Sequence, residues 1–102
     1  MKTFTALFAT TALALSANVA LAKDVQPDQV VKLVQSQQIQ SLDTLKQKAL
    51  DQHKGATVTD SELEEEYGRY IYKVELRDAQ NVEWDVDMDA KTGEILKNVQ
   101  DH

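Results

Sequence analysis

The chain contains no cysteine, one proline and three glycines among its 102 residues. Without cysteine no disulfide can form, so a folded domain must be stabilised by packing alone. Long hydrophobic runs are also scarce. The apolar stretch from Phe4 to about Leu15 is shorter than the roughly 20 residues that a membrane-spanning helix needs. The length suits one small domain and is too short for two.

The amino terminus has the features of a secretory signal peptide. Lys2 precedes the apolar stretch, and the small-x-small site Ala20-Leu21-Ala22 follows it. This order predicts a signal peptide over residues 1–22 that is cleaved after Ala22. The mature domain would then span residues 23–102, be periplasmic or secreted, and keep no stable membrane anchor.

The charge balance is acidic, with 17 Asp and Glu against 11 Lys and Arg and a formal net charge of −6. Binding to nucleic acid requires clusters of basic side chains that neutralise phosphates. The composition therefore argues against a nucleic-acid partner and against an anionic membrane surface.

Two amphipathic helices are expected in the first half of the mature chain. The first spans about Pro27 to Ser36, with Pro27 in the first turn, where its missing N–H is no loss. The second begins after the N-cap Ser41 and ends near His53, before Gly55. The apolar positions follow helical spacing: Val30, Leu33 and Val34 in the first helix, and Leu42, Leu45, Ala49 and Leu50 in the second. Between the helices, Ile39 is expected to pack into the core.

Strands are expected from residue 56 onward. The segment 56–65 reads as an edge strand with a disturbed centre, because Val58 and Leu63 have opposite parity and face the same side only across a bulge. Its acidic side chains would discourage pairing with other chains. The next residues, Tyr67-Gly68, read as a tight hairpin turn in which Gly68 adopts a positive φ.

Two runs of strict alternation follow, 70–77 and 82–89, and each has an apolar and a charged face. Matching the faces requires a loop with an odd number of residues, satisfied by Ala79-Gln80-Asn81 with Asn81 left-handed. The register then sets Leu76 opposite Trp84, Val74 opposite Val86, Arg77 opposite Glu83 and Lys73 opposite Asp87. A turn at residues 89–93 and a final strand from Glu94 to about Val99 complete the pattern.

These elements predict an α+β fold: two N-terminal helices packed on one face of an antiparallel β-meander of three to four strands. Three motifs sharpen this prediction, Tyr-x-Tyr-x-Val-x-Leu at 70–76, Val-x-Trp-x-Val-x-Met-Asp at 82–89 and Ala-x-Thr-Gly-Glu-Ile-Leu at 90–96. Together they resemble the PepSY domain family over about residues 42–97. The resemblance implies a helix packed on an antiparallel sheet, as in the pro-regions of thermolysin-like peptidases. It also implies an inhibitory or regulatory role without catalytic residues.

Candidate metal sites in the sequence are weak. Asp85, Asp87 and Asp89 alternate along a strand, as any solvent-facing strand does, and an EF-hand loop beginning at Asp85 would lack its glycine and its bidentate carboxylate. The two histidines, His53 and His102, have no cysteine to complete a zinc site, and His53 is expected to face the dipole of the second helix. We therefore predict no metal, no cofactor and no enzyme activity.

A small binding patch is the better candidate. Ile71 interrupts an otherwise charged strand face beside Arg69 and Lys73, and Tyr67 lies at the adjacent turn. Tyr67, Arg69 and Ile71 are therefore the predicted binding residues, and the sheet edges offer pairing with an extended segment.

The function expected from the sequence is an exported, non-catalytic PepSY binding module that modulates or inhibits a peptidase or another envelope protein. The alternative is a soluble periplasmic sensor or buffer that binds a small ligand or a divalent cation through its acidic face. The identity of the partner and the oligomeric state stay open.

Overall fold

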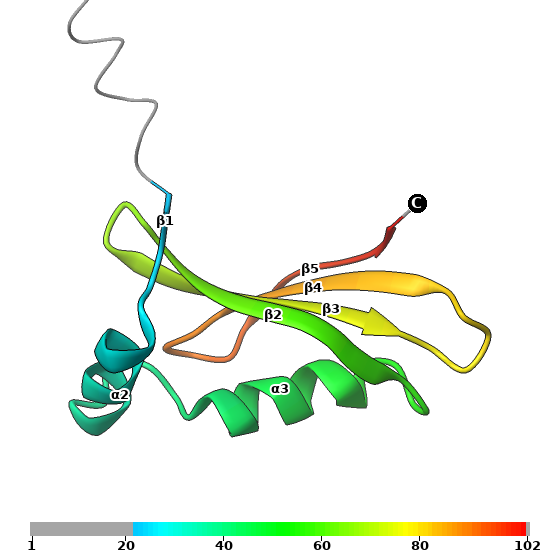
Figure 1. Ribbon diagram of the computed structural model, residues 1–102, viewed down its shortest axis with the longest axis horizontal. Helices are drawn as coiled ribbons and strands as arrows, with labels where there is room; N and C mark the ends of the chain where they lie inside the picture. The colour runs from blue at the N-terminus through cyan, green and yellow to red at the C-terminus, as the bar shows by residue number, and fades with distance from the viewer. Residues whose placement is uncertain (1–21, 102) are drawn as a thin grey trace, which may run out of the picture.

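The computed structural model describes residues 22–101, so the predicted signal peptide, except for Ala22, and also His102 lie outside the described residues. The described residues form two helices and one antiparallel five-stranded sheet, which confirms the α+β class (Figure 1). The elements are β1 (Lys23–Asp24), α2 (Pro27–Gln35), α3 (Leu42–Asp51), β2 (Thr57–Glu66), β3 (Arg69–Arg77), β4 (Glu83–Asp89) and β5 (Ile95–Asp101). Neither helix is long and apolar enough to cross a membrane.

The strand count and the helix positions correct the sequence prediction. The sheet has five strands in the order β1-β2-β3-β4-β5, and both helices lie between β1 and β2 instead of preceding every strand. β1 pairs with the end of β2, where Lys23 faces Glu65 and Asp24 faces Glu64. A strand of two residues is too short to show alternation, so it leaves no signal in the sequence.

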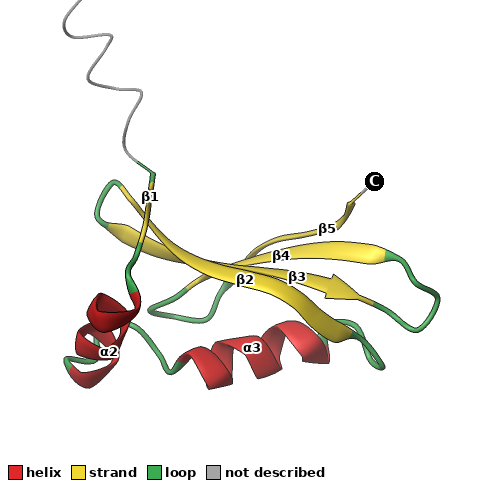
Figure 2. Ribbon diagram, in the orientation of Figure 1, coloured by secondary structure: helices red, strands yellow, loops and turns green. Residues whose placement is uncertain are grey.

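One helix covers one face of the sheet (Figure 2). α3 buries Leu45 and Ala49 in the core, whereas α2 lies beyond the amino end of α3 and has no fully buried residue. Ile39, in the connection between them, is buried as predicted. The next residue anchors this connection, because the Gln40 N–H donates to the Ala90 carbonyl at 2.8 Å.

The predicted register of the central hairpin is confirmed. Leu76 faces Trp84, and Val74 faces Val86. The loop between β3 and β4 closes with Asn81 at φ 68°, in the left-handed region. β2 shows the expected irregularity between Val58 and Asp60, which brings Val58 and Leu63 to the same face. Hydrophobic patterning and turn chemistry therefore agree on one register.

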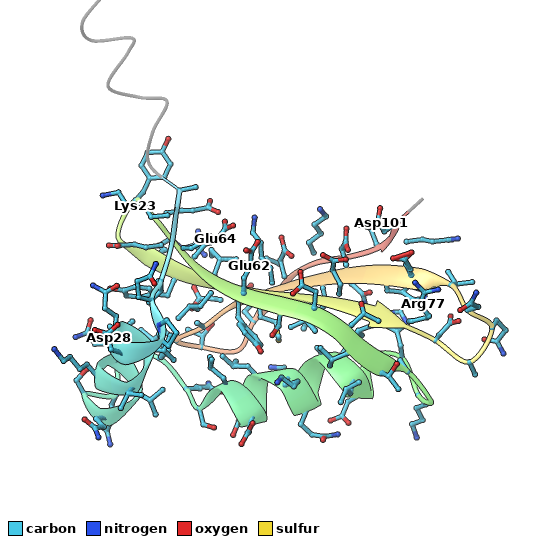
Figure 3. All side chains as sticks on the ribbon, in the orientation of Figure 1. Lys23, Asp28, Glu62, Glu64, Arg77 and Asp101 are labelled. Atoms are coloured by element: carbon cyan, nitrogen blue, oxygen red, sulfur yellow. The ribbon has the colours of Figure 1, made fainter. Side chains whose placement is uncertain are left out.

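The two faces of the sheet differ sharply in character. The face toward α3 holds the core, whose buried members are Ile39, Leu45, Ala49, Leu63, Tyr72, Val74, Leu76, Val86, Met88 and Ala90. The opposite face, called the outer face below, is charged, and Glu62, Glu64 and Asp101 point away from α3 there (Figure 3). Lys73 lies opposite Asp87 as predicted, but it forms ion pairs with Glu64 at 3.1 Å and with Glu66 at 3.8 Å.

One row of the outer face brings like charges together. Glu75 on β3 lies between Asp60 on β2 and Asp85 on β4. Partial desolvation, followed by the negative charges of Asp60 and Asp85, raises the pKa of Glu75 above its ordinary value. Like charges directly opposite each other destabilise a sheet.

Removing this charge should stabilise the domain. We expect Glu75→Gln to raise the free energy of unfolding at pH 7 by about 0.5 kcal/mol, or a few degrees in melting temperature. Because the folded-state pKa is raised, the folded protein binds the proton first, and wild-type stability increases as the pH falls through that pKa. The difference should therefore vanish below the ordinary glutamate pKa of 4.5. Thermal unfolding of both proteins across this pH range measures it, and a constant difference would contradict the assignment.

Candidate functional site

The tip of the β2–β3 hairpin presents the most exposed large hydrophobic side chain of the described residues. Tyr67 is 75% exposed there. Tyr67 and Gly68 have φ values of 53° and 81°, so both central positions of the turn are left-handed, as a two-residue type I′ hairpin requires. Glycine meets this requirement without strain, but tyrosine rarely does. The turn therefore projects an aromatic side chain from the sheet while its backbone adopts a conformation that is unfavourable for tyrosine.

Arg69 links this tip to the β4–β5 turn. Its Nη2 donates to Asp89 Oδ2 at 3.2 Å, and the Arg69 side chain stays 57% exposed. Asp89 Oδ1 accepts the backbone N–H groups of Lys91 at 2.9 Å and Thr92 at 3.1 Å. Burial alone would raise the pKa of Asp89, but these two hydrogen bonds and Arg69 lower it below its usual value. The charged form is thus favoured, and it ties the two turns together.

A pocket of about 320 Å³ lies where these two turns meet the connection between α2 and α3. Its lining is Gln38, Gly68, Arg69, Tyr70, Asp89, Lys91 and Thr92. The walls combine an aromatic surface with both signs of charge. Such a mixture suits a polar or charged peptide side chain better than a purely apolar group. Tyr67, Arg69 and this pocket are called the hairpin-tip site below.

The expected exposure of Ile71 is wrong. Ile71 is only 7% exposed, although it points to the outer face. Its direct neighbours across the sheet are Glu64 and Asp89. Both take part in ion pairs, Glu64 with Lys73 and Asp89 with Arg69, which hold long side chains over this part of the face. The aliphatic stems of such side chains cover apolar surface. Ile71 is therefore buried and contributes little to the exposed surface beside Arg69.

The conformation of the tip can be tested at Gly68, because a Cβ added there meets no atom within 4 Å. Any loss of stability in Gly68→Ala must then come from backbone strain at φ +81°. We expect a cost of about 1 kcal/mol, or roughly 4–8 °C in melting temperature. Gly68→Asn is the matched control, since asparagine tolerates the left-handed region and should cost less. Equal melting temperatures for the two variants would contradict the type I′ turn.

Within residues 22–101, six acidic residues of the outer face converge in two groups of three. In each group the carboxylate oxygens lie within 4.8 Å of one another: Asp24, Glu62 and Glu64 in the first, and Glu75, Glu83 and Asp101 in the second. Desolvation, followed by a hydrogen bond with Glu64, raises the pKa of Glu62. The aspartates singled out in the sequence do not converge. Asp85, Asp87 and Asp89 alternate along β4, and Asp89 is bound to Arg69.

His53 has a structural role at the opposite end of the sheet. It follows the end of α3, its ring stacks on Trp84 with centroids 4.2 Å apart, and its Nε2 lies 2.7 Å from Asn98 Oδ1. The Trp84 Nε1–H donates to Asp78 Oδ2 at 2.9 Å. His53 thus lies at the carboxyl end of α3 as expected, where its backbone N–H donates to the Leu50 carbonyl, and its ring also packs against Trp84 on β4. His102 lies outside the described residues.

Sequence reasoning missed the hydrogen bonds of Asp89 and the pocket beside them. The bond to Arg69 and the pocket depend on residues far apart in the chain, which meet because the β2–β3 hairpin and the β4–β5 turn end at the same side of the sheet. One local signal was available. An aspartate three residues before Thr92 and four before Gly93 is typical of a turn in which the carboxylate accepts backbone N–H groups.

The structure is that of a small α+β module in which one helix covers an open antiparallel sheet. Residues 39–98 match the family described as "Peptidase propeptide and YPEB domain", or PepSY. The chain belongs to the PepSY family, which confirms the resemblance noted over residues 42–97. PepSY domains are in general non-catalytic modules of the propeptide or inhibitor type.

One curated relative matches part of the chain. The chain is 44% identical over 43 residues to the uncharacterized protein YkoJ of Bacillus subtilis (strain 168). This match covers 42% of the chain and 25% of YkoJ, so the chain matches about a quarter of that relative. No solved structure matches the chain.

Proposed function

We propose that this protein is an exported, non-catalytic PepSY binding module that modulates or inhibits a peptidase or another envelope protein. The observation that carries the proposal is the hairpin-tip site. Tyrosine and arginine are among the residue types that most often dominate binding energy at protein interfaces. Here one of each projects from the same rigid turn, beside a pocket.

The site is organised before any partner arrives. The type I′ turn fixes the backbone under Tyr67, and the ion pair with Asp89 holds Arg69 while leaving more than half of its side chain exposed. Side chains held in this way lose less conformational entropy on binding. A rigid protruding tip suits insertion into the groove of a partner, and a peptidase substrate groove is such a partner surface.

Export belongs to the same proposal. The signal peptide predicted over residues 1–22 would deliver the domain to the periplasm or the medium, where it would meet envelope proteins and exported peptidases. Stability without disulfides is compatible with either compartment, because the core is formed entirely by packed apolar side chains.

The proposal is tested with the purified chain in two assays. In the first, the immobilised chain is exposed to an envelope extract, and bound proteins are identified. In the second, the chain is added to each captured peptidase, and the rate of cleavage of a standard substrate is measured. We expect at least one partner whose activity or stability changes. A chain that captures no protein and alters no cleavage rate would overturn the proposal.

The alternative function, binding of a divalent cation through the acidic face, is favoured by one observation. Asp24, Glu62 and Glu64 bring three carboxylates together from β1 and β2, and the raised pKa of Glu62 reports the unfavourable charge density there. A cation that binds the folded state would raise the melting temperature. The melting temperature is therefore measured with calcium or magnesium at millimolar concentration, for wild type and for Glu62→Gln. A rise with calcium that is absent in Glu62→Gln would support cation binding, and no rise would argue against it.

A further inference from the structure

The two edges of the sheet differ in how well they are protected. The β2 edge is covered by β1 at Glu64 and Glu65, is bulged between Val58 and Asp60, and carries acidic side chains. Each of these features discourages strand pairing. β5, at the far edge in Figure 1, has no covering strand among the described residues and no register shift beyond its first residues, and it carries a single acidic side chain, Asp101. It keeps an unbroken register with β4 from Lys97 to Asp101.

β5 also exposes apolar side chains. Leu96 is 42% exposed and Val99 is 44% exposed. Val99 points to the outer face, because it lies opposite Asp85, and Lys97 and Asp101 share that face opposite Asp87 and Glu83. This edge therefore presents one apolar residue between two opposite charges, in a regular strand with free backbone hydrogen-bonding groups.

The sequence of this edge is complementary to itself. In an antiparallel pair of two copies with continuous faces, residues of equal parity must lie opposite each other. Pairing Val99 with Val99 then sets Lys97 opposite Asp101 of the second copy, and this ion pair occurs twice. It also sets Asn98 opposite Gln100 on the other face. Shifting the centre to Asn98 sets Lys97 opposite Val99 and Asp101 opposite Ile95, so both charges face uncharged residues. A centre at Gln100 sets Asp101 opposite Val99 and leaves Lys97 beyond the paired residues, and a centre at Lys97 opposes two lysines.

We propose that this protein forms a two-fold symmetric dimer by antiparallel pairing of β5 with β5, with Val99 at the symmetry axis. The interface is isologous, and the two sheets become continuous. A strand of this length buries less surface than a standard stable interface, so the dimer is weak and its population depends on concentration. The hairpin-tip site is built by β3 and the turns at its end, so it stays free, and the inference stands independently of the proposed function.

Charge substitutions at this edge test both the dimer and its register. Lys97 and Asp101 form no ion pair with each other among the described residues, so exchanging their charges removes no such contact inside one copy. Lys97→Glu and Asp101→Lys each turn two attractive pairs of the dimer into repulsive ones. We expect each variant to raise the dissociation constant by about tenfold or more.

The experiment is sedimentation equilibrium of the purified chain from about 10 μM to 1 mM. The buffer is at physiological ionic strength, where the Debye length of roughly 8 Å screens repulsion between the negatively charged copies. Wild type should show a monomer–dimer equilibrium, and each single variant should be mainly monomeric. An equal mixture of Lys97→Glu and Asp101→Lys should dimerise again, as should the double variant. Lys54→Glu, an equal charge change at an exposed lysine outside the sheet, should behave as wild type.

Three results would overturn the proposal. One is a wild-type chain that stays monomeric at the highest concentration. Another is dimerisation of the single variants with wild-type affinity. The third is failure of the mixture and the double variant to restore the dimer. If the wild-type chain stays monomeric but its β5 edge binds a basic extended peptide, this edge pairs with a foreign segment and not with a second copy. Circular dichroism of each variant verifies that it is folded.

Discussion

Replacing Leu45 by alanine is expected to lower the free energy of unfolding by about 3 kcal/mol. Leu45 is the central contact of α3 with the sheet, and its side chain is 0% exposed. Truncation removes buried apolar surface and leaves a cavity that a close-packed core fills only in part. A domain of this size would lose roughly 12–24 °C in melting temperature, which thermal unfolding followed by circular dichroism measures.

The control for this substitution is the preceding residue on the same helix. Thr44 is exposed, so Thr44→Ala removes no core contact and should change the free energy of unfolding by less than about 0.5 kcal/mol. If both variants unfold within a few degrees of each other, α3 is not held by its apolar face. The large effect is expected because no disulfide reinforces the packing of this helix.

Replacing Tyr67 by asparagine is expected to move stability and binding in opposite directions. Asparagine followed by glycine is the preferred pair for a type I′ turn, so Tyr67→Asn should relieve strain and leave the melting temperature unchanged or higher. Loss of the exposed ring should weaken binding to the captured partner by about 30-fold, equivalent to about 2 kcal/mol. A residue that served only the fold could not produce this combination.

The measurement is a titration of the partner by calorimetry or surface plasmon resonance with wild type and variant. Val31→Ala is the matched control, because Val31 is also an exposed large hydrophobic residue but lies on α2, outside the hairpin-tip site. It should bind as wild type does. Unchanged affinity of Tyr67→Asn, or equal losses in both variants, would exclude the tip as the contact surface.

Tyr67 lies in the left-handed region, which is unfavourable for tyrosine. Backbone strain persists where the surrounding structure determines the conformation, and it gathers at binding sites. The chain retains glycine at the second turn position, where it is needed, but carries tyrosine at the first, where asparagine would be more stable. Contact of the Tyr67 ring with the partner proposed above would account for this choice.

Patterns in the sequence were enough to predict both helices, the four longer strands and the register of the central hairpin, but not the two-residue strand β1. Alternation in 70–77 and 82–89, together with the parity of the loop at Asn81, was sufficient to pair Leu76 with Trp84, because a shift by one residue would expose the apolar face. The bulge in β2 and the buried position of Ile39 followed from the same hydrophobic patterning. These are local properties, and local spacing encodes them.

Tertiary structure alone decided which residues are available for binding. Ile71 interrupts a charged pattern and appeared exposed, yet ion pairs from β2 and β4 bury it. The link from Arg69 to Asp89, the pocket beside it, the strand β1 and the bare edge at β5 also depend on residues distant in the chain. Exposure is set by neighbours across the sheet, and spacing along one strand carries no information about them.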